Sequence, residues 1–174
     1  MKISQFFLLL FLLASCNTPQ AVYDYDQQAN FSQYQTYAIY PELLTGLSQL
    51  DEGRLIASVE KGLQNKSLNP SEEPDLYMNI YSEEYRRQSD SQLGIGVGGG
   101  GRNMGVGVSG GIPLGGPETY LVLTFDLIDA KTDALVWQAV VESSFDLDAA
   151  PAERQQRFDQ IVQKALSGYP PKRR

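Results

Sequence analysis

The sequence predicts one α+β domain, in which a mainly antiparallel sheet of about five or six strands carries two helices on one face. Segments in which apolar and polar residues alternate recur along the chain, and such alternation is typical of strands with one covered face. Two further segments repeat apolar residues at helical spacing. A length of 174 residues suits one domain with one modest core.

Two strands are expected near the N-terminus, at residues 22–26 and 36–40. Both are rich in tyrosine and other strand-favouring residues, and residues 31–35 link them. Pro41 ends the second strand, because proline lacks the N–H group that a sheet ladder requires.

The two helices are expected at residues 48–65 and from Pro151 onward. Ser48 is a favourable N-cap with Asp51 three residues further on, and Pro151 suits the first helical position. Gly168 then ends the second helix. The apolar faces consist of Leu55, Ile56, Val59 and Leu63 in the first helix and Phe158, Ile161, Val162, Ala165 and Leu166 in the second.

Three longer strands are expected at residues 76–85, 119–128 and 134–144. Residues 129–133 favour a turn, so the last two strands form a hairpin. The side chains expected to face inward are Leu76, Met78, Ile80, Leu121, Leu123, Phe125, Leu127, Leu135, Trp137, Ala139 and Val141. We expect the helices to pack on the sheet through Leu121, Leu123, Phe125 and Trp137.

The N-terminus has the pattern of an export signal. Lys2 precedes an apolar run at residues 6–13, which is too short to span a bilayer. The run ends in Leu-Ala-Ser-Cys, which resembles the lipobox of bacterial lipoproteins and implies cleavage before Cys16 and acylation of that cysteine. We therefore expect a signal peptide at residues 1–15, an acylated cysteine with a short tether at residues 16–21, and one domain at residues 22–171.

The sorting signal and the charge narrow the location and the partners. Residue 17 is Asn rather than Asp, which in enterobacterial systems implies the outer membrane. Acidic residues outnumber basic ones by 21 to 14, so nucleic acid is not an expected partner. Residues 172–174 form a short basic tail that suits a solvated chain end or a contact with anionic lipid.

Residues 94–116 hold twelve of the sixteen glycines. They contain a formal Gly-x-Gly-x-x-Gly match, but no helical sequence follows it, as a dinucleotide site would require. We expect a flexible loop or a weak hairpin inserted before the last hairpin. If the segment has a function, it would be an adaptable surface that contacts a partner or the bilayer.

Three of the ten tyrosines share one face of the strand at residues 76–85. A row of tyrosines suits a glycan or a protein partner, because each ring joins an apolar face to a polar tip. Cross-strand packing is the alternative reason for such a row. The candidate partner contacts are Tyr77, Tyr81 and Tyr85, together with Arg102 of the glycine-rich segment.

No catalytic residue, cofactor or metal ion is predicted. Histidine is absent, which removes the commonest general base and a common metal ligand. Pairs of carboxylates leave a carboxylate-dependent envelope hydrolase as one alternative. One of these pairs, Asp24 with Asp26, could instead hold a calcium ion. A lipid or small-ligand carrier is another alternative, which needs an apolar cavity between helices and sheet. The carboxylate pairs are Asp24 with Asp26, Glu83 with Glu84, and Asp126 with Asp129.

Short motifs spaced through the chain carry a family resemblance: Asp24-Tyr25-Asp26, Phe31 with Tyr34, Thr36-Tyr37-Ala38, Pro74-Asp75-Leu76, residues 127–132, Leu135-Val136-Trp137 and Tyr169-Pro170-Pro171. On these motifs the chain resembles the envelope lipoprotein family catalogued as domain of unknown function 4136. Ile39 and Asp133 depart from the family, which often has Trp and Gly there. The resemblance supports the fold and the envelope location and implies no active residue.

The sequence thus predicts a non-enzymatic binding or scaffolding lipoprotein of the cell envelope. Its expected partners are the membrane, through the lipid on Cys16, and an envelope protein or glycan.

Replacing the acylated residue tests the anchor. Cys16→Ala removes the only thiol, so we expect a soluble or unprocessed product that takes up no labelled palmitate. Membrane fractionation and palmitate labelling measure this against the unchanged protein. A wild-type product that is freely soluble, with an unmodified thiol, would contradict the anchor.

Overall fold

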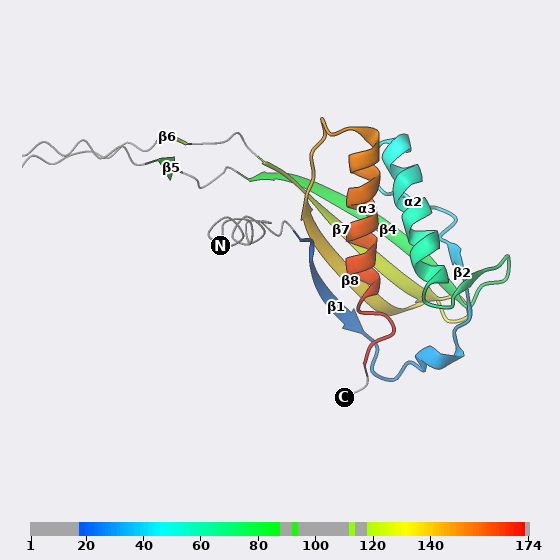
Figure 1. The fold of residues 1–174 in the computed structure, drawn as a ribbon. Helices are drawn as coiled ribbons and strands as arrows, with labels where there is room; N and C mark the ends of the chain where they lie inside the picture. The colour runs from blue at the N-terminus through cyan, green and yellow to red at the C-terminus, as the bar shows by residue number, and fades with distance from the viewer. Residues whose placement is uncertain (1–17, 88–91, 94–111, 114–117, 173–174) are drawn as a thin grey trace, which may run out of the picture.

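The computed structural model describes residues 18–87, 92–93, 112–113 and 118–172. Within them, a six-stranded sheet carries two helices side by side on one face (Figure 1). This confirms the predicted α+β class. The expected signal peptide, Cys16, Arg102 and most of the glycine-rich segment lie outside the described residues.

The sheet has the strand order β1-β8-β7-β4-β2-β3. Strand β2 runs parallel to both β3 and β4, and the other neighbours are antiparallel. The strands are β1 (Gln20–Tyr25), β2 (Thr36–Ile39), β3 (Asn69–Pro70), β4 (Leu76–Arg87), β7 (Glu118–Asp129) and β8 (Ala134–Ser144). A separate antiparallel pair consists of β5 (Gln92–Leu93) and β6 (Ile112–Pro113), at the two ends of the glycine-rich region. The helices are η2 (Phe31–Gln33, a 3-10 turn), α2 (Gln49–Gln64) and α3 (Pro151–Leu166).

Local sequence signals set the helix ends as expected. Ser48 is the N-cap of α2, and its Oγ accepts the N–H of Asp51 at 3.3 Å. Pro151 is the first residue of α3. Helix α2 and then β3 lie between β2 and β4 in the chain, and this crossover explains why β2 and β4 are parallel neighbours.

The core lies between the helices and the central strands. Trp137, Phe125 and Phe158 are fully buried there, as is Leu55 of α2. Every predicted sheet position named for helix packing is buried, with Leu121 the most exposed of them at 3%. Helices and sheet therefore share one continuous hydrophobic layer.

One inward prediction was wrong. Leu135 is 49% exposed, although it alternates in register with the buried Trp137. Leu127 pairs with Trp137, but Ile128 pairs with Leu135, so Val136 is an extra residue in β8. This β-bulge turns Leu135 to the opposite face of the sheet.

Edge strand β1 is held against the C-terminal end of α3. The Tyr23 hydroxyl donates to the carbonyl oxygen of Lys164 at 2.6 Å and lies 2.9 Å from Ser167 Oγ. Gly168 permits this approach, because a Cβ there would meet the Tyr23 ring at 2.4 Å. The start of the domain is thereby fixed beside α3.

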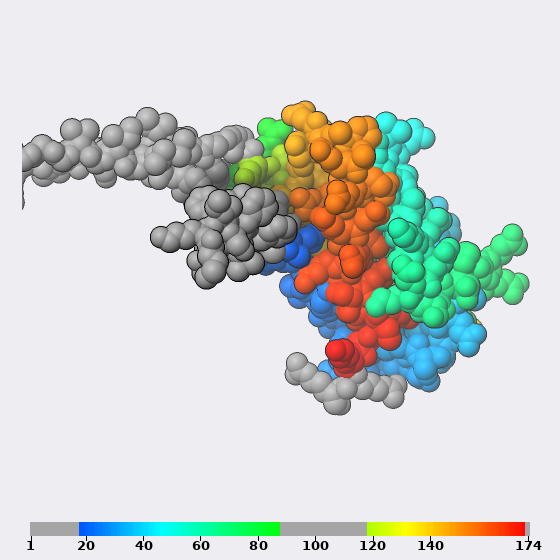
Figure 2. All heavy atoms as spheres, viewed as in Figure 1, coloured from blue at the N-terminus to red at the C-terminus, as the bar shows by residue number. Residues whose placement is uncertain are grey.

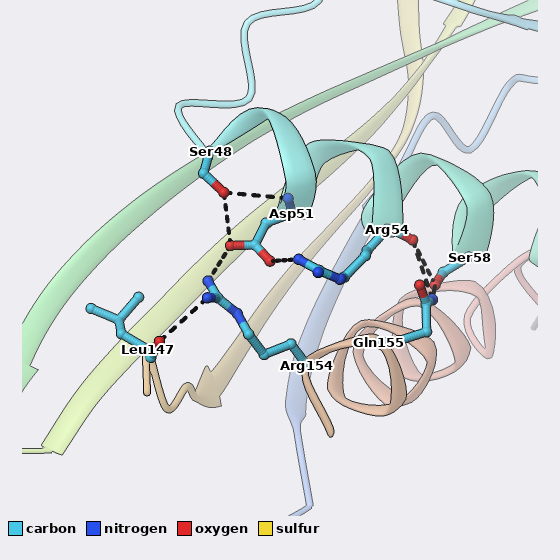
Figure 3. Close-up of polar contacts among 7 residues, drawn as sticks. All are labelled: Ser48, Asp51, Arg54, Ser58, Leu147, Arg154 and Gln155. Carbon is cyan, nitrogen blue, oxygen red and sulfur yellow. Dashed lines mark hydrogen bonds and ion pairs between the residues drawn. The ribbon is translucent and has the colours of Figure 1, made fainter. Parts of the chain in front are cut away.

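A charged network joins the two helices (Figure 3). Asp51 of α2 is 3% exposed and accepts hydrogen bonds from Arg54 Nη1 at 2.7 Å and from Arg154 Nη2 of α3. The Ser48 hydroxyl lies 3.0 Å from the second carboxylate oxygen. Arg154 also packs its guanidinium over the Phe145 ring, 5.3 Å from the centroid. The carboxylate is thus both buried and paired.

A second buried carboxylate lies on the other face of the sheet. Asp126 of β7 is 9% exposed and accepts a hydrogen bond from Gln138 Nε2 at 2.8 Å. Burial raises the pKa of Asp126 above its ordinary value, although hydrogen bonds from Gln138 and Asn79 act in the opposite direction. The folded state therefore favours the protonated form of this group.

Removing Arg154 tests the interhelical network. Arg154→Met leaves Asp51 buried with one cation, so we expect a loss of about 2–3 kcal/mol in the free energy of unfolding. Urea unfolding at neutral pH measures the loss. Arg86→Met, at an exposed position of β4, is the control and should change stability by less than about 0.5 kcal/mol. Equal losses in the two variants would contradict a special role for the network.

Neutralising Asp126 tests its buried charge. Asp126→Asn should raise stability by about 1 kcal/mol at pH 7, because the folded state no longer buries a carboxylate. The gain should disappear as the pH falls below the ordinary Asp pKa of about 3.9, where the wild-type group is protonated in both states. Urea unfolding at the two pH values measures this, with the exposed Asp24→Asn as control. A gain that is independent of pH would refute the assignment.

Candidate functional site

The face of the sheet opposite the helices carries no helix within the described part of the chain (Figure 1). We call it the uncovered face. Its side chains line up across four strands, because Val22 pairs with Val140, Val140 with Thr124, and Thr124 with Tyr81. Val22 is 73% exposed and Tyr81 is 40% exposed, whereas Thr124 between them is buried. The result is a broad surface with apolar and aromatic side chains at its borders.

The three predicted tyrosines of β4 all lie on this face, and two of them pair with other rings. Tyr77 contacts Tyr40 edge-on, with ring centroids 5.7 Å apart. Tyr85 stacks on Tyr120 of β7 at 5.5 Å, and these two residues are also cross-strand partners. Tyr81 is the most exposed of the three. The row therefore fits both interpretations, because Tyr77 and Tyr85 pack against other rings whereas Tyr81 is exposed to a partner.

A cation completes the aromatic pair at the end of β4. The Arg87 guanidinium carbon lies 4.6 Å from the Tyr120 ring centroid and 5.6 Å from that of Tyr85. Arg87 Nη2 donates to the Tyr85 hydroxyl at 3.0 Å and lies 3.3 Å from Glu142 Oε1 of β8. Partial desolvation, then the hydrogen bond to Glu142, raises the pKa of Tyr85.

No local sequence pattern predicted this cluster. Arg87 and Glu142 are 55 positions apart, and only the register of three strands brings them together. The one sequence pattern that pointed toward it is the alternation of apolar and polar residues in β7. This alternation places Tyr120 on the same face as the other polar residues of that strand.

The candidate carboxylate pairs occupy different environments. Asp24 and Asp26 are exposed, and each accepts a nearby backbone N–H, from Tyr25 at 2.9 Å and from Gln28 at 2.8 Å. Glu83 and Glu84 are also exposed and belong to opposite faces of β4.

The third pair is divided between the sheet and a turn. Asp126 is buried on the uncovered face, whereas Asp129 begins the hairpin turn and accepts the N–H groups of Lys131 and Thr132. Tyr34 also donates its hydroxyl to Asp129, at 2.9 Å. Within the described residues, no three His, Cys, Asp or Glu side chains converge to hold a metal ion.

One hollow has a volume of about 870 Å³ and lies where β7 begins and β8 ends, beside the start of α3. It is lined by charges of both signs, including Arg86, Glu118 and Asp146. Two of its acids have local structural partners: Asp146 accepts the N–H of Asp148 at 2.9 Å, and Glu153 accepts that of Ala150 at 3.3 Å. These bonds stabilise the loop and the first turn of α3.

Among the described segments, no helix combines the length and the apolar character that crossing a bilayer requires.

Comparison with solved structures identifies relatives in fold. The chain is similar to a PDZ domain protein from Parabacteroides distasonis, with a TM-score of 0.56 and 12% identity over 95% of this chain. It spans only 40% of the length of that protein. It is also similar to PelC from Paraburkholderia phytofirmans, solved as a dodecamer, with a TM-score of 0.52 and 14% identity over 86% of this chain and 96% of that one. At these identities the likeness shows a shared fold.

Comparison of sequences gives the family. No protein with a curated function matches the chain. Residues 21–171 match the sequence profile of the family described as domain of unknown function DUF4136. The matched region begins at the second residue of β1 and ends beyond α3, so it includes nearly all of the sheet and both helices. The chain therefore belongs to the DUF4136 family.

Proposed function

We propose that this protein is a lipid-anchored lipoprotein of the bacterial cell envelope. It acts as a non-enzymatic binding or scaffolding module, and its partners bind the uncovered face of the sheet. The signal-like N-terminus and its Leu-Ala-Ser-Cys ending support the anchor on Cys16. The outer membrane is the proposed location, because Asn rather than Asp follows Cys16.

The observation that carries the binding role is the exposed side-chain row on the uncovered face. Val22 and Tyr81 present apolar and aromatic surface at either end of this row. Aromatic surface bordered by polar groups suits a protein partner or a glycan, because tyrosine offers both stacking and a hydroxyl. Arg102 remains a proposed contact from the glycine-rich segment, outside the described residues.

Two features favour binding over the alternatives. A carrier needs an apolar cavity between helices and sheet, but Phe125, Trp137 and Phe158 fill that layer with no exposed surface. A carboxylate-dependent hydrolase needs two acids facing one another across a cleft, whereas the three candidate pairs lie at a strand end, on opposite strand faces or divided between the sheet and a turn.

Assembly with copies of itself is one form that scaffolding can take. PelC from Paraburkholderia phytofirmans, which shares the fold, was solved as a dodecamer. A self-partner is therefore one of the outcomes to be distinguished.

Site-directed photocrosslinking in intact cells tests the binding role. A benzophenone side chain at Tyr81 should give a defined adduct, because this position is exposed on the uncovered face. Mass spectrometry of the adduct separates a foreign protein from a glycan and from a multiple of this chain.

The same side chain at Glu60, an exposed position on α2, is the matched control and should give no such adduct. Identical products at the two positions, or none at Tyr81, would refute a specific partner on this face.

A further inference from the structure

We propose that a basic surface on α2 and α3 docks on anionic phospholipid headgroups and so determines which side of the domain faces the bilayer. The inference rests on the proposed lipid anchor at Cys16 and goes beyond it, because an anchor alone leaves the orientation free.

The chain enters the domain on the outer side of α3. Pro19 is buried and Thr18 is exposed, and both line a hollow of about 560 Å³ against that helix. The α3 side of the hollow consists of Arg157, Gln160, Gln163, Lys164 and Ser167. Figure 2 shows this side of the molecule, with the blue start of the domain beside the orange and red atoms of α3.

The entry point cannot swing away from α3 without breaking the fold. Strand β1 begins directly after Pro19, where Gln20 pairs with Glu142 of β8, and the Tyr23 hydroxyl is hydrogen-bonded to the end of α3. Cys16 precedes Thr18 by two residues, so their Cα atoms are at most about 7 Å apart. An acylated Cys16 therefore brings the lipid headgroups to the outer side of α3.

The lining of this hollow and of a neighbouring one is mainly basic, although the chain as a whole is acidic. A second hollow, of about 470 Å³, lies between α2 and α3 and shares Gln163 and Ser167 with the first, so the two form one surface. The charged residues that line this basic helix surface are Lys61, Lys66, Arg157 and Lys164, with Asp159 as the one acid. The whole chain has 14 basic and 21 acidic residues.

The one acid has partners within the protein. Asp159 Oδ1 accepts hydrogen bonds from Ser58 Oγ at 2.6 Å and from Gln155 Nε2 at 3.1 Å. Its charge is thus partly compensated by two donors, and the net charge of the surface remains positive.

Compensation of the helix dipoles explains only part of this pattern. Lys61 and Lys164 lie in the last turns of their helices, where cations are favoured. Arg157 lies in the middle of α3, where the dipole offers no such advantage, yet it lines the same hollow as Thr18.

Electrostatics then selects one orientation. Charges within about 8 Å of anionic headgroups are attracted at physiological salt, and the tether keeps Arg157 and Lys164 near that range. The uncovered face instead carries Asp24, Glu83 and Glu142, with Arg87 as the cation paired with Glu142. The helix layer should face the bilayer, and the tyrosines of β4 should face away from it.

Headgroup quenching of a site-specific fluorophore tests the orientation. Cys16 is the only cysteine and is blocked by acylation, so a new cysteine is the only free thiol in the lipidated protein. Gln163→Cys reports on the basic helix surface, and Glu83→Cys is the matched exposed control on the uncovered face. Both labelled proteins are reconstituted into vesicles of phosphatidylcholine and phosphatidylglycerol that contain nitroxide-headgroup lipid.

We expect strong quenching at position 163 and little at position 83. Each Lys or Arg near an anionic surface changes the ratio of docked to undocked molecules about five-fold. Adding Lys61→Gln and Lys164→Gln, or using phosphatidylcholine alone, should therefore reduce quenching at position 163 toward the level at position 83.

The outcomes separate the orientation from the anchor. Equal quenching at the two positions, in a protein that carries palmitate and floats with the vesicles, would overturn the orientation and leave the anchor intact. Quenching at position 163 that is unchanged by both charge removal and neutral lipid would overturn the headgroup contact. A protein without palmitate that stays in solution would overturn the anchor and this inference together.

Discussion

The burial of Trp137, Phe125 and Phe158 between helices and sheet is the interaction on which the rest of the structure depends. Complete burial of one such large side chain contributes roughly 1.5–3 kcal/mol, and all three have no exposed surface. Both helices are needed to cover this layer, and both lie on the same face. The opposite face is therefore left to cross-strand pairs such as Tyr85 with Tyr120, which stabilise it without closing it to a partner.

The two helices are held in place at both ends of their contact. At one end, Arg154 of α3 reaches the buried carboxylate of Asp51 on α2. At the other end, Gly62 allows a close approach, because a Cβ there would lie 2.6 Å from Leu166 Cδ1. Apolar packing has no preferred direction, so it does not by itself fix which helix ends lie together. The hydrogen-bonded ion pair between Arg154 and Asp51 is directional and holds the two helix N-termini side by side. This arrangement also positions the outer side of α3 beside β1.

Sequence patterns predicted the elements well where local chemistry decides them. Ser48 and Pro151 mark helix starts through capping and ring geometry, and the alternation of β4 separates Met78 from Tyr77.

The patterns failed where the pairing between strands determines the structure. Leu135 alternates as an inward residue but is turned outward by a one-residue bulge, which only the partner strand reveals. The short parallel strand β3 escaped prediction because its two residues, Asn69 and Pro70, are poor strand formers. The cluster of Arg87 with Glu142 depends on the same long-range register.

The placement of the entry point beside α3 connects the fold to its proposed role. A domain that is tied to a membrane by a few residues can offer a partner only the sides that the bilayer does not cover. Here the side that we propose to be tied is polar and basic, from Lys164 to Lys66, and polar side chains can remain hydrated against headgroups at little cost. The aromatic side chains are on the opposite face, where burial by a partner releases water from apolar surface and so favours binding. An exchange of these two faces would bury charges at the partner interface and leave Tyr81 against the headgroups. The distribution of charge and aromatic surface thus supports the proposal that the helix layer faces the bilayer and that the sheet binds the partner.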